Sequence, residues 1–263
     1  MNLSIVIPIY NSSQIIHKLI DQLNSKIDNK IVKKFEIILV NDCSKDNSWD
    51  IIKKITKKNS KIRGINLFKN YGQHSAIFAG LKFARGQKII TMDDDLQHPP
   101  SSIMSIYKKL DDYDLCYTLY LNRKHPAWKK IISYLNNVYS SFLFNKPINI
   151  YHSSFRGFKL HICKKIIHFK KPIIFLDSLL LRETKNISTI KIVHKKRFKG
   201  DSNYKLNNLF SLFFDMIVNY HFLPMRFGTL LGVVSKFIVQ VLRILNHQKK
   251  FQYKIKEKTF LSK

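Results

Sequence analysis

The amino-acid sequence predicts an α/β fold with a mostly parallel central sheet and helices on both faces. Four apolar runs typical of buried strands are each followed by a polar loop, at residues 3–9, 35–40, 62–67 and 88–92. Helical patterns separate these runs, and such an alternation favours parallel pairing with helices covering both faces of the sheet. Because the carboxyl ends of parallel strands share one edge, we expect the polar loops to gather there.

The helices and later strands follow from apolar spacing. A first helix is indicated by Ile15, Ile16, Leu19, Ile20 and Leu23, a second begins near Trp49, and a third covers residues 76–84 before Arg85-Gly86 ends it. Further along, the pattern predicts helices at 101–110, 128–144 and 179–182, and strands at 113–117 and 187–194.

Three adjacent carboxylates follow the strand at residues 88–92. In an extended segment Asp93 and Asp95 face one side, with Gln97 next in line, while Asp94 faces away. Oxygen ligands of this kind suit Mg²⁺ or Mn²⁺, which commonly bridge protein carboxylates to substrate phosphates. The alternative is an acidic surface turn, but the buried strand before the acids and the Leu-Gln-His-Pro-Pro after them favour a metal–phosphate site.

The composition indicates a folded protein with anionic partners. Of 263 residues 45% are hydrophobic, and 46 Lys and Arg stand against 17 Asp and Glu, giving a formal net charge of +29. Nucleic acid, anionic lipid and a phosphorylated substrate all suit this charge. The lysines are scattered and the aromatic residues lie mostly in apolar runs, so no nucleic-acid partner is expected.

The cysteines and the N-terminus indicate a cytoplasmic setting. Cys43, Cys116 and Cys163 are far apart and show neither a disulfide framework nor metal-ligand spacing. The first residues run directly into a strand, and we expect no signal peptide.

Four motifs in order resemble those of the family-2 glycosyltransferases, and among them the polyprenyl-phosphate sugar transferases. They are Val-Ile-Pro-Ile-Tyr-Asn at 6–11, Val-Asn-Asp-Cys-Ser-Lys-Asp at 40–46, Asn-Tyr-Gly-Gln-His at 70–74 and Met-Asp-Asp-Asp-Leu-Gln-His-Pro-Pro at 92–100. The resemblance covers residues 3–115 strongly and continues more loosely to about 230. It implies a nucleotide-sugar-binding fold of the GT-A type, a nucleoside-diphosphate sugar donor and inversion at the anomeric carbon.

The resemblance also assigns roles to residues of the first half. Asp93, Asp95 and Gln97 would hold the divalent metal against the diphosphate, and Asp42 would contact the edge of a uracil or guanine base. The nucleotide-sugar pocket would be lined by Pro8, Tyr10, Asn11, Asp42, Asn70, Gln73, Asp93 and Asp94. Structural alternatives are that Pro8 and Gly72 serve only as turn residues and that Asp46 caps a helix.

In the second half the resemblance is looser. Arg156 and Arg197 would stabilise the leaving diphosphate, Arg123, Ser202 and Lys205 would contact the acceptor phosphate, and Asp95 and Asp177 are counted with the catalytic residues. The alternatives are that Arg156 is a structural arginine and that residues 123–125 form a solvated loop. Asp177 is the candidate general base or acceptor-positioning carboxylate, or alternatively a helix N-cap. The chain departs from the family pattern at Tyr117-Thr118-Leu119-Tyr120, where an arginine is expected, and at Tyr151-His152, where an acid often stands.

The C-terminal part predicts association with a membrane surface. We divide the chain into a catalytic domain at 1–205 and amphipathic, juxtamembrane helices with a basic tail at 206–263. Residues 227–245 are mostly apolar, but Lys236 and Arg243 interrupt them, which favours an interfacial helix on anionic lipid at the cytoplasmic face of the cell membrane. One poor transmembrane segment and a soluble helical hairpin are the alternatives, and a homo-oligomer is left open.

Three functions compete at this point. The first is metal-dependent transfer of a sugar to a polyprenyl phosphate such as undecaprenyl phosphate, for cell-envelope synthesis. The second is transfer to the hydroxyl of a lipid-linked saccharide, which would require a carboxylate base such as Asp177. The third, from a different class, is a basic nucleic-acid-binding or membrane scaffold protein.

Overall fold

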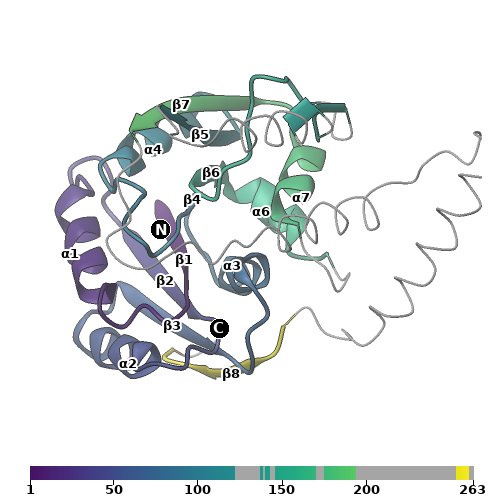
Figure 1. The fold of residues 1–263 in the computed structure, drawn as a ribbon. Helices are drawn as coiled ribbons and strands as arrows, with labels where there is room; N and C mark the ends of the chain where they lie inside the picture. The colour runs from purple at the N-terminus through teal and green to yellow at the C-terminus, as the bar shows by residue number, and fades with distance from the viewer. Residues whose placement is uncertain (122–136, 139, 143–145, 170–174, 194–252, 261–263) are drawn as a thin grey trace, which may run out of the picture.

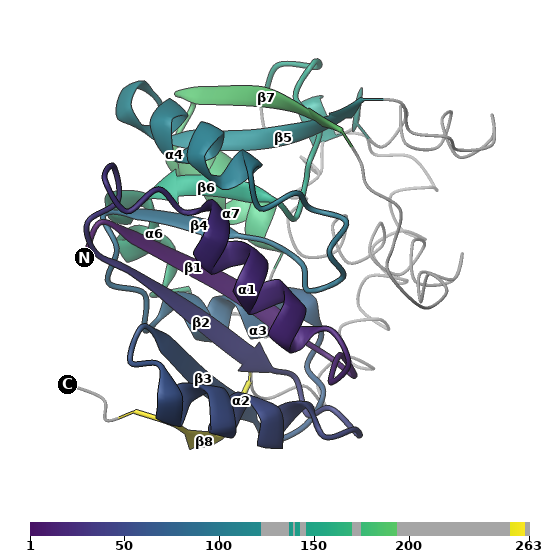
Figure 2. The same cartoon turned by 90° about the vertical axis from the view of Figure 1, so that its left-hand side faces the viewer.

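A single mixed sheet organises the part of the chain that the computed structural model describes, namely residues 1–121, 137–138, 140–142, 146–169, 175–193 and 253–260 (Figures 1 and 2). Its strand order is β7-β5-β6-β4-β1-β2-β3-β8. The strands are β1 (Leu3–Ile9), β2 (Phe35–Asn41), β3 (Ile62–Leu67), β4 (Lys88–Thr91), β5 (Leu115–Leu121), β6 (Arg156–Lys159), β7 (Ile187–Val193) and β8 (Ile255–Lys258).

The parallel pairing predicted for the first four strands is confirmed. β1 pairs with β2 and with β4, and β2 pairs with β3, all in parallel. β5 and β7 are also parallel, whereas β6 runs antiparallel between β4 and β5. The short β6 was not predicted, because Arg-Gly-Phe-Lys carries no alternating pattern.

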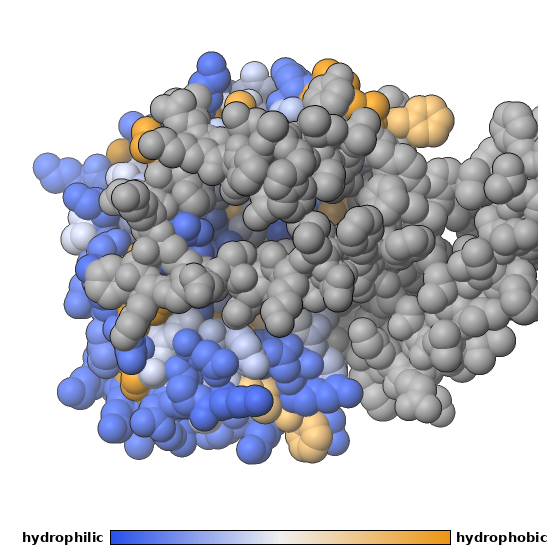
Figure 3. Space-filling model, viewed as in Figure 1, coloured by the Kyte–Doolittle hydropathy of each residue, from blue (hydrophilic) through white to orange (hydrophobic). Residues whose placement is uncertain are grey.

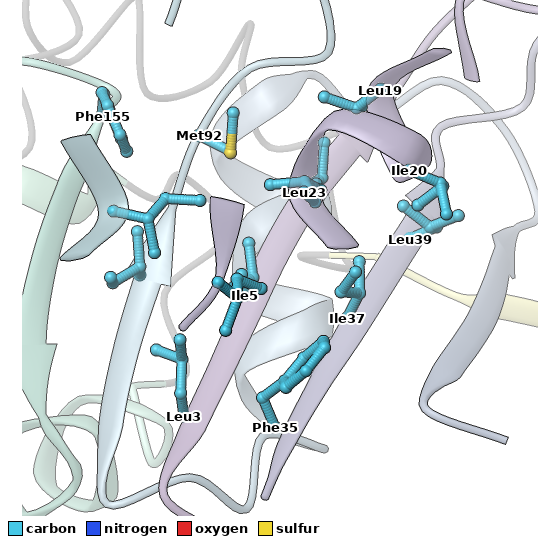
Figure 4. Close-up of a cluster of buried hydrophobic side chains, with 14 of the residues drawn as sticks. Leu3, Ile5, Leu19, Ile20, Leu23, Phe35, Ile37, Leu39, Met92 and Phe155 are labelled. Carbon is cyan, nitrogen blue, oxygen red and sulfur yellow. The ribbon is translucent and has the colours of Figure 1, made fainter. Parts of the chain in front are cut away.

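Helices cover both faces of the sheet, as predicted. α1 (Ile16–Lys26), α2 (Ser48–Lys58) and α4 (Ser102–Asp112) bury their apolar sides in one core cluster, and α3 (Gln73–Leu81), α6 (Leu160–Ile166) and α7 (Leu176–Glu183) contribute to the other. Figure 2 shows α1 and α2 in front of the sheet and α3 behind it. In Figure 4, Leu19 and Leu23 of α1 pack over Ile5 of β1 and Ile37 of β2.

The C-terminal strand β8 differs from the predicted basic tail. Residues 255–258 pair antiparallel with β3, and the indole nitrogen of Trp49 donates to Glu257 Oε2 at 2.8 Å. Phe260 packs against Phe83 and lies under the guanidinium of Arg63, 3.7 Å from its ring centroid. The alternating Lys and Glu side chains concealed this strand in the sequence, because an edge strand tolerates charge on its exposed side.

The strand directions place both flanks of residues 194–252 at one edge of the sheet. β4 and β5 both run antiparallel to β6, so they point in the same direction. β7 is parallel to β5 and therefore ends at the carboxyl edge of β1 to β4. β8 is antiparallel to β3 and therefore begins at that same edge. The predicted helices between residues 206 and 245, together with Arg123, Arg197, Ser202 and Lys205, lie outside the described residues.

The close packing of α3 on the sheet leads to a stability prediction. A Cβ added to Gly80 would lie 2.5 Å from Val6 Cγ1 and 2.9 Å from Val40 Cγ2, both of which are fully buried side chains. Overpacking costs about 1–3 kcal/mol, whereas the better helix propensity of alanine returns at most about 1 kcal/mol. We expect Gly80→Ala to lower the free energy of unfolding in urea, and Val6→Ala in the same chain to relieve part of that loss. Strictly additive losses would contradict the predicted contact.

Candidate active site

Hydrogen bonds join the loops that follow β1, β2 and β4 at the carboxyl edge. The backbone N–H of Asn11 donates to Ser44 Oγ at 3.0 Å, and Asn11 Oδ1 accepts the N–H of Lys45 at 2.8 Å. The N–H of Tyr10 donates to Asp94 Oδ2 at 3.3 Å. The predicted gathering of the polar loops is thus confirmed. The side chain of Asn11 links the loop after β1 to the loop after β2.

Each of these three loops contains one non-glycine residue in the left-handed region. The φ values are +53° for Asn11, +56° for Cys43 and +61° for Leu96. Such conformations persist only where the surroundings impose them, and they concentrate at functional sites. Their position around one edge therefore supports this edge as the functional site.

The carboxylate of Asp93 is held by side chains from two other segments. Gln73 Nε2, in the first turn of α3, donates to Asp93 Oδ1, and Ser154 Oγ donates to Asp93 Oδ2 at 2.7 Å. Asp95 Oδ1 accepts the N–H of Gln97 at 3.0 Å, which closes a tight turn. The structure brings Asp93, Gln73 and Ser154 together, and the contribution of Ser154 was not visible in the sequence because it is 61 residues away from Asp93.

Asp94 binds back to the loop after β1. Its Oδ2 accepts Ser12 Oγ at 2.5 Å in addition to the N–H of Tyr10. Removal from solvent raises the pKa of Asp94 to about 7, although the hydrogen bond from Ser12 opposes the shift. These contacts indicate that Asp94 fixes the geometry of the acidic loop, whereas the sequence placed it in the nucleotide-sugar pocket.

The other predicted nucleotide contacts divide into buried and exposed groups. Pro8 is buried within β1, where it pairs in register with Val40, and it is therefore not a turn residue. Tyr10 is 37% exposed at the end of the same strand, and Asn70 is exposed with its Oδ1 accepting the N–H of Gly72. Tyr10 and Asn70 are thus open to a ligand at the carboxyl edge.

Asp42 is buried and anchors the loop before α3. Its two carboxylate oxygens accept the backbone N–H groups of Tyr71 and Gly72, each at 2.8 Å, and the residue is only 3% exposed. Burial raises the pKa of Asp42, while the two backbone bonds act in the opposite direction. The structure thus gives Asp42 a positioning role for the loop, and its contact with a base edge stays a prediction.

This arrangement predicts how Asp42→Asn will behave. The amide would set an N–H₂ group against one backbone N–H, and an unsatisfied buried donor costs about 1–3 kcal/mol. We expect the affinities for UDP and for GDP to fall by the same factor as each other, measured by calorimetry with Mn²⁺ present. A change in the preference between the two nucleotides would instead support the base-edge hypothesis, and Asp50→Asn on the exposed side of α2 is the control.

Arg156 and Asp177 form a buried ion pair behind the acidic loop. Arg156 is 1% exposed and Asp177 4% exposed, and a guanidinium nitrogen of Arg156 donates to Asp177 Oδ1. Tyr117 OH donates to the same oxygen at 2.8 Å, and Arg156 Nε lies 3.4 Å from Thr91 Oγ1. Burial alone would raise the pKa of Asp177, but the positive charge and hydrogen bond of Arg156, together with the nearby His152 and His74, lower the pKa to about 2.

The ion pair corrects one prediction and adds residues that the sequence did not reveal. Asp177 lies in the first turn of α7, whose N-cap is Phe175, so the alternative interpretation of Asp177 as a helix N-cap is wrong. Tyr117 from β5 and His152, whose Nδ1 is 3.8 Å from Asp177 Oδ1, complete the cluster. Only the strand order brings these four residues together, and no local spacing could have identified them.

The acidic loop fits a cation that is shared with a substrate. Within the described residues, no group of three or more His, Cys, Asp or Glu side chains could hold a metal ion by itself. Mg²⁺ and Mn²⁺ are often bound by only one or two carboxylates together with substrate phosphates, and Asp93 and Asp95 supply such a donor set. The chemistry of these residues therefore suits a metal–diphosphate site, with Gln97 as the predicted third oxygen donor.

The sheet order, the helix layers and the acidic loop define a GT-A-like α/β fold, the class to which several solved glycosyltransferases belong. Glucosyl-3-phosphoglycerate synthase from Mycobacterium tuberculosis, solved with Mn²⁺, UDP and phosphoglyceric acid, superimposes with a TM-score of 0.60 at 15% identity, covering 82% of this chain and 76% of that one. S. aureus TarS 1–349 in complex with UDP superimposes with a TM-score of 0.53 at 20% identity, covering 73% of this chain and 60% of that one.

The chain belongs to the glycosyl transferase family 2, whose sequence profile matches residues 4–167. It is 32% identical over 231 residues to the undecaprenyl-phosphate 4-deoxy-4-formamido-L-arabinose transferase of Shewanella sediminis, covering 87% of this chain and 70% of that protein. It is 31% identical over 246 residues to the protein of the same name from Serratia proteamaculans, covering 92% and 75%. The protein is an enzyme, a family-2 glycosyltransferase, and the predicted family is confirmed.

Proposed function

We propose that this glycosyltransferase moves a sugar, with inversion, from a nucleoside-diphosphate sugar to a polyprenyl phosphate such as undecaprenyl phosphate. The proposed acceptor rests on the 31–32% identity, over most of the chain, to two transferases named for undecaprenyl phosphate. The donor is supported by the Asp93–Gln97 loop at the carboxyl edge and by the UDP complexes of two structural neighbours.

A divalent cation, Mg²⁺ or Mn²⁺, would neutralise the charge that develops on the leaving diphosphate. Asp93 and Asp95 would hold it, with Gln97 beside them. Residues outside the acidic loop keep these oxygens in place, since Gln73 and Ser154 fix the Asp93 carboxylate and Ser12 fixes Asp94. The Mn²⁺ complex of the M. tuberculosis neighbour supports this choice of cation.

The state of Asp177 favours a phosphate acceptor over a hydroxyl acceptor. An efficient general base has a pKa near the working pH, whereas Asp177 has a pKa near 2 and is committed to Arg156 and Tyr117. A lipid phosphate is already anionic, so its oxygen attacks the anomeric carbon and the bond to the diphosphate breaks without removal of a proton. The pairing also withholds Arg156 from the leaving group, which favours a positioning role and leaves Arg197 as the proposed cation.

We place the enzyme at the cytoplasmic surface of the membrane. The net charge of +29 suits anionic lipid, and hydrophilic side chains dominate the surface over α2 and β8 (Figure 3). Both flanks of residues 194–252 lie at the carboxyl edge of one sheet, so the chain returns to the side that it leaves. This favours the interfacial interpretation of residues 227–245 over one membrane crossing. Among the described helices, none is long and apolar enough to span a bilayer.

The proposal is tested by transfer of labelled sugar with the purified full chain in detergent. The donor panel contains UDP- and GDP-sugars with Mn²⁺, and the acceptors are undecaprenyl phosphate, undecaprenol and an undecaprenyl-linked saccharide. We expect label on undecaprenyl phosphate alone and loss of transfer on addition of EDTA. Label only on the linked saccharide would establish the hydroxyl-acceptor alternative, and absence of donor binding across the panel would contradict the proposed function.

A further inference from the structure

His98 contacts Asp93 from within the acidic loop itself. The loop turns back on itself at Leu96, which has φ +61°, and this brings His98 against Asp93. The backbone N–H of Asp93 donates to His98 Nδ1 at 3.0 Å, and the residue is only 4% exposed. The imidazole is therefore part of the loop's internal structure.

The two ring nitrogens of His98 lie near different parts of Asp93. A donor directed at Nδ1 requires a lone pair there, so Nε2 is the ring nitrogen left to act as a donor. Nε2 lies 3.7 Å from Asp93 Oδ2, which is beyond hydrogen-bond distance but places the imidazole beside the carboxylate. Nδ1 therefore binds the backbone of Asp93, and Nε2 lies within electrostatic range of its side chain.

Two aromatic rings hold the imidazole plane in this orientation. Phe155 stacks on His98 with ring centroids 5.0 Å apart and planes 15° apart, and Tyr120 stacks at 6.0 Å and 18°. Phe155 directly precedes β6 and Tyr120 lies in β5, so residues of the sheet fix the plane of the imidazole and the position of Nε2. Gln73 and Ser154 grip the same carboxylate from α3 and from the segment before β6.

We propose that His98 is a positioning residue, which holds Asp93 through the hydrogen bond at Nδ1, keeps Nε2 beside the carboxylate and thereby sets the affinity of the site for the divalent cation. This inference rests on the proposed metal–diphosphate function of the acidic loop. Groups that orient a carboxylate or histidine ligand in this manner typically change metal affinity or activity by about 10–100-fold when they are removed.

The test compares His98→Phe with His98→Gln in the full chain, with UDP and Mn²⁺ as probes. Phenylalanine keeps the stack between Phe155 and Tyr120 but loses both nitrogens, whereas glutamine loses the stack and returns an amide N–H near the position of Nε2. We expect His98→Phe to be the more stable variant in thermal unfolding. We also expect it to need about 10–100-fold more Mn²⁺ than wild type for half-maximal UDP binding, with glutamine recovering part of this loss.

The two measurements must therefore rank the variants in opposite order. If the Mn²⁺ requirement follows stability, or is unchanged in His98→Phe, His98 only packs and the inference is overturned. Should His98→Phe not fold, His98→Asn replaces it, because asparagine retains an acceptor for the Asp93 N–H without a group at Nε2, and glutamine must still bind Mn²⁺ more tightly. His17→Phe on the exposed side of α1 is the control. Wild type that binds UDP without any Mn²⁺ dependence would overturn the proposed function itself.

Discussion

Asp95→Asn is expected to reduce sugar transfer by roughly 10²–10³-fold while leaving the protein folded. Removal of a group that stabilises charge in the transition state typically costs this much. Asp95 is chosen over Asp93 because Asp93 accepts bonds from Gln73 and Ser154, which its substitution would also disturb. The N–H of Gln97 that Asp95 accepts can also be accepted by the amide oxygen of asparagine, so the turn survives. The measurement is the transfer rate at saturating donor and undecaprenyl phosphate across a Mn²⁺ titration.

Two comparisons make the Asp95 result specific. Asp50→Asn changes an exposed carboxylate in the first turn of α2 and should keep full transfer. Asp93→Asn should also impair transfer, but it should lower stability in addition, because one amide N–H₂ would face the donor of Gln73 or Ser154. Undiminished transfer by Asp95→Asn at every Mn²⁺ concentration would show that Asp95 does not hold the cation.

The alternation of apolar runs and amphipathic helices was sufficient to predict the fold of residues 1–112. Each strand from β1 to β4 is a mostly buried apolar run, and short segments connect these strands in sequence. The local apolar pattern therefore agrees with the position of each strand in the sheet. The pattern failed at β6 and β8, which are four-residue strands that contain charged residues and no clear apolar alternation. Both owe their conformation to pairing with an existing strand, and that information lies in β4, β5 and β3 rather than in their own residues.

The site was predictable to the extent that one loop carries it. Asp93, Asp95 and Gln97 follow each other directly, and the buried strand before them fixes their place at the carboxyl edge. The contacts that fix Asp93 in the structure come from residues 20 and 61 positions away. Likewise, Arg156 and Asp177 were assigned separate roles in catalysis, because nothing in either segment shows that the two charges neutralise each other.

Asp177→Asn is expected to lower the free energy of unfolding by about 3–5 kcal/mol, because it leaves the Arg156 guanidinium buried without a counter-charge. Urea denaturation with a fitted m value measures the loss. The double variant Arg156→Met/Asp177→Leu should be more stable than Arg156→Met alone or Asp177→Leu alone, because each single variant leaves one buried charge unpaired. Apolar replacement of a whole buried pair is often nearly neutral. A double variant that loses the sum of the single effects would contradict a direct pair.

The pH dependence of stability gives the pair a second signature. The folded pKa of Asp177 lies near 2, below the ordinary 3.8, so its contribution to stability is complete above about pH 4 and is lost as the pH falls towards 2. Wild type should therefore lose about 2 kcal/mol more than Asp177→Asn over this window.

Transfer measured near neutral pH then separates the roles of Asp177. An acid that only positions Arg156 and Tyr117 leaves substantial transfer in the folded Asp177→Asn variant, whereas loss of a general base removes about 10²–10⁴-fold. A loss in that range, with the free energy of unfolding unchanged, would mean that Asp177 leaves its ion pair to accept a proton. The acceptor would then be a hydroxyl group, and the lipid-phosphate proposal would be wrong.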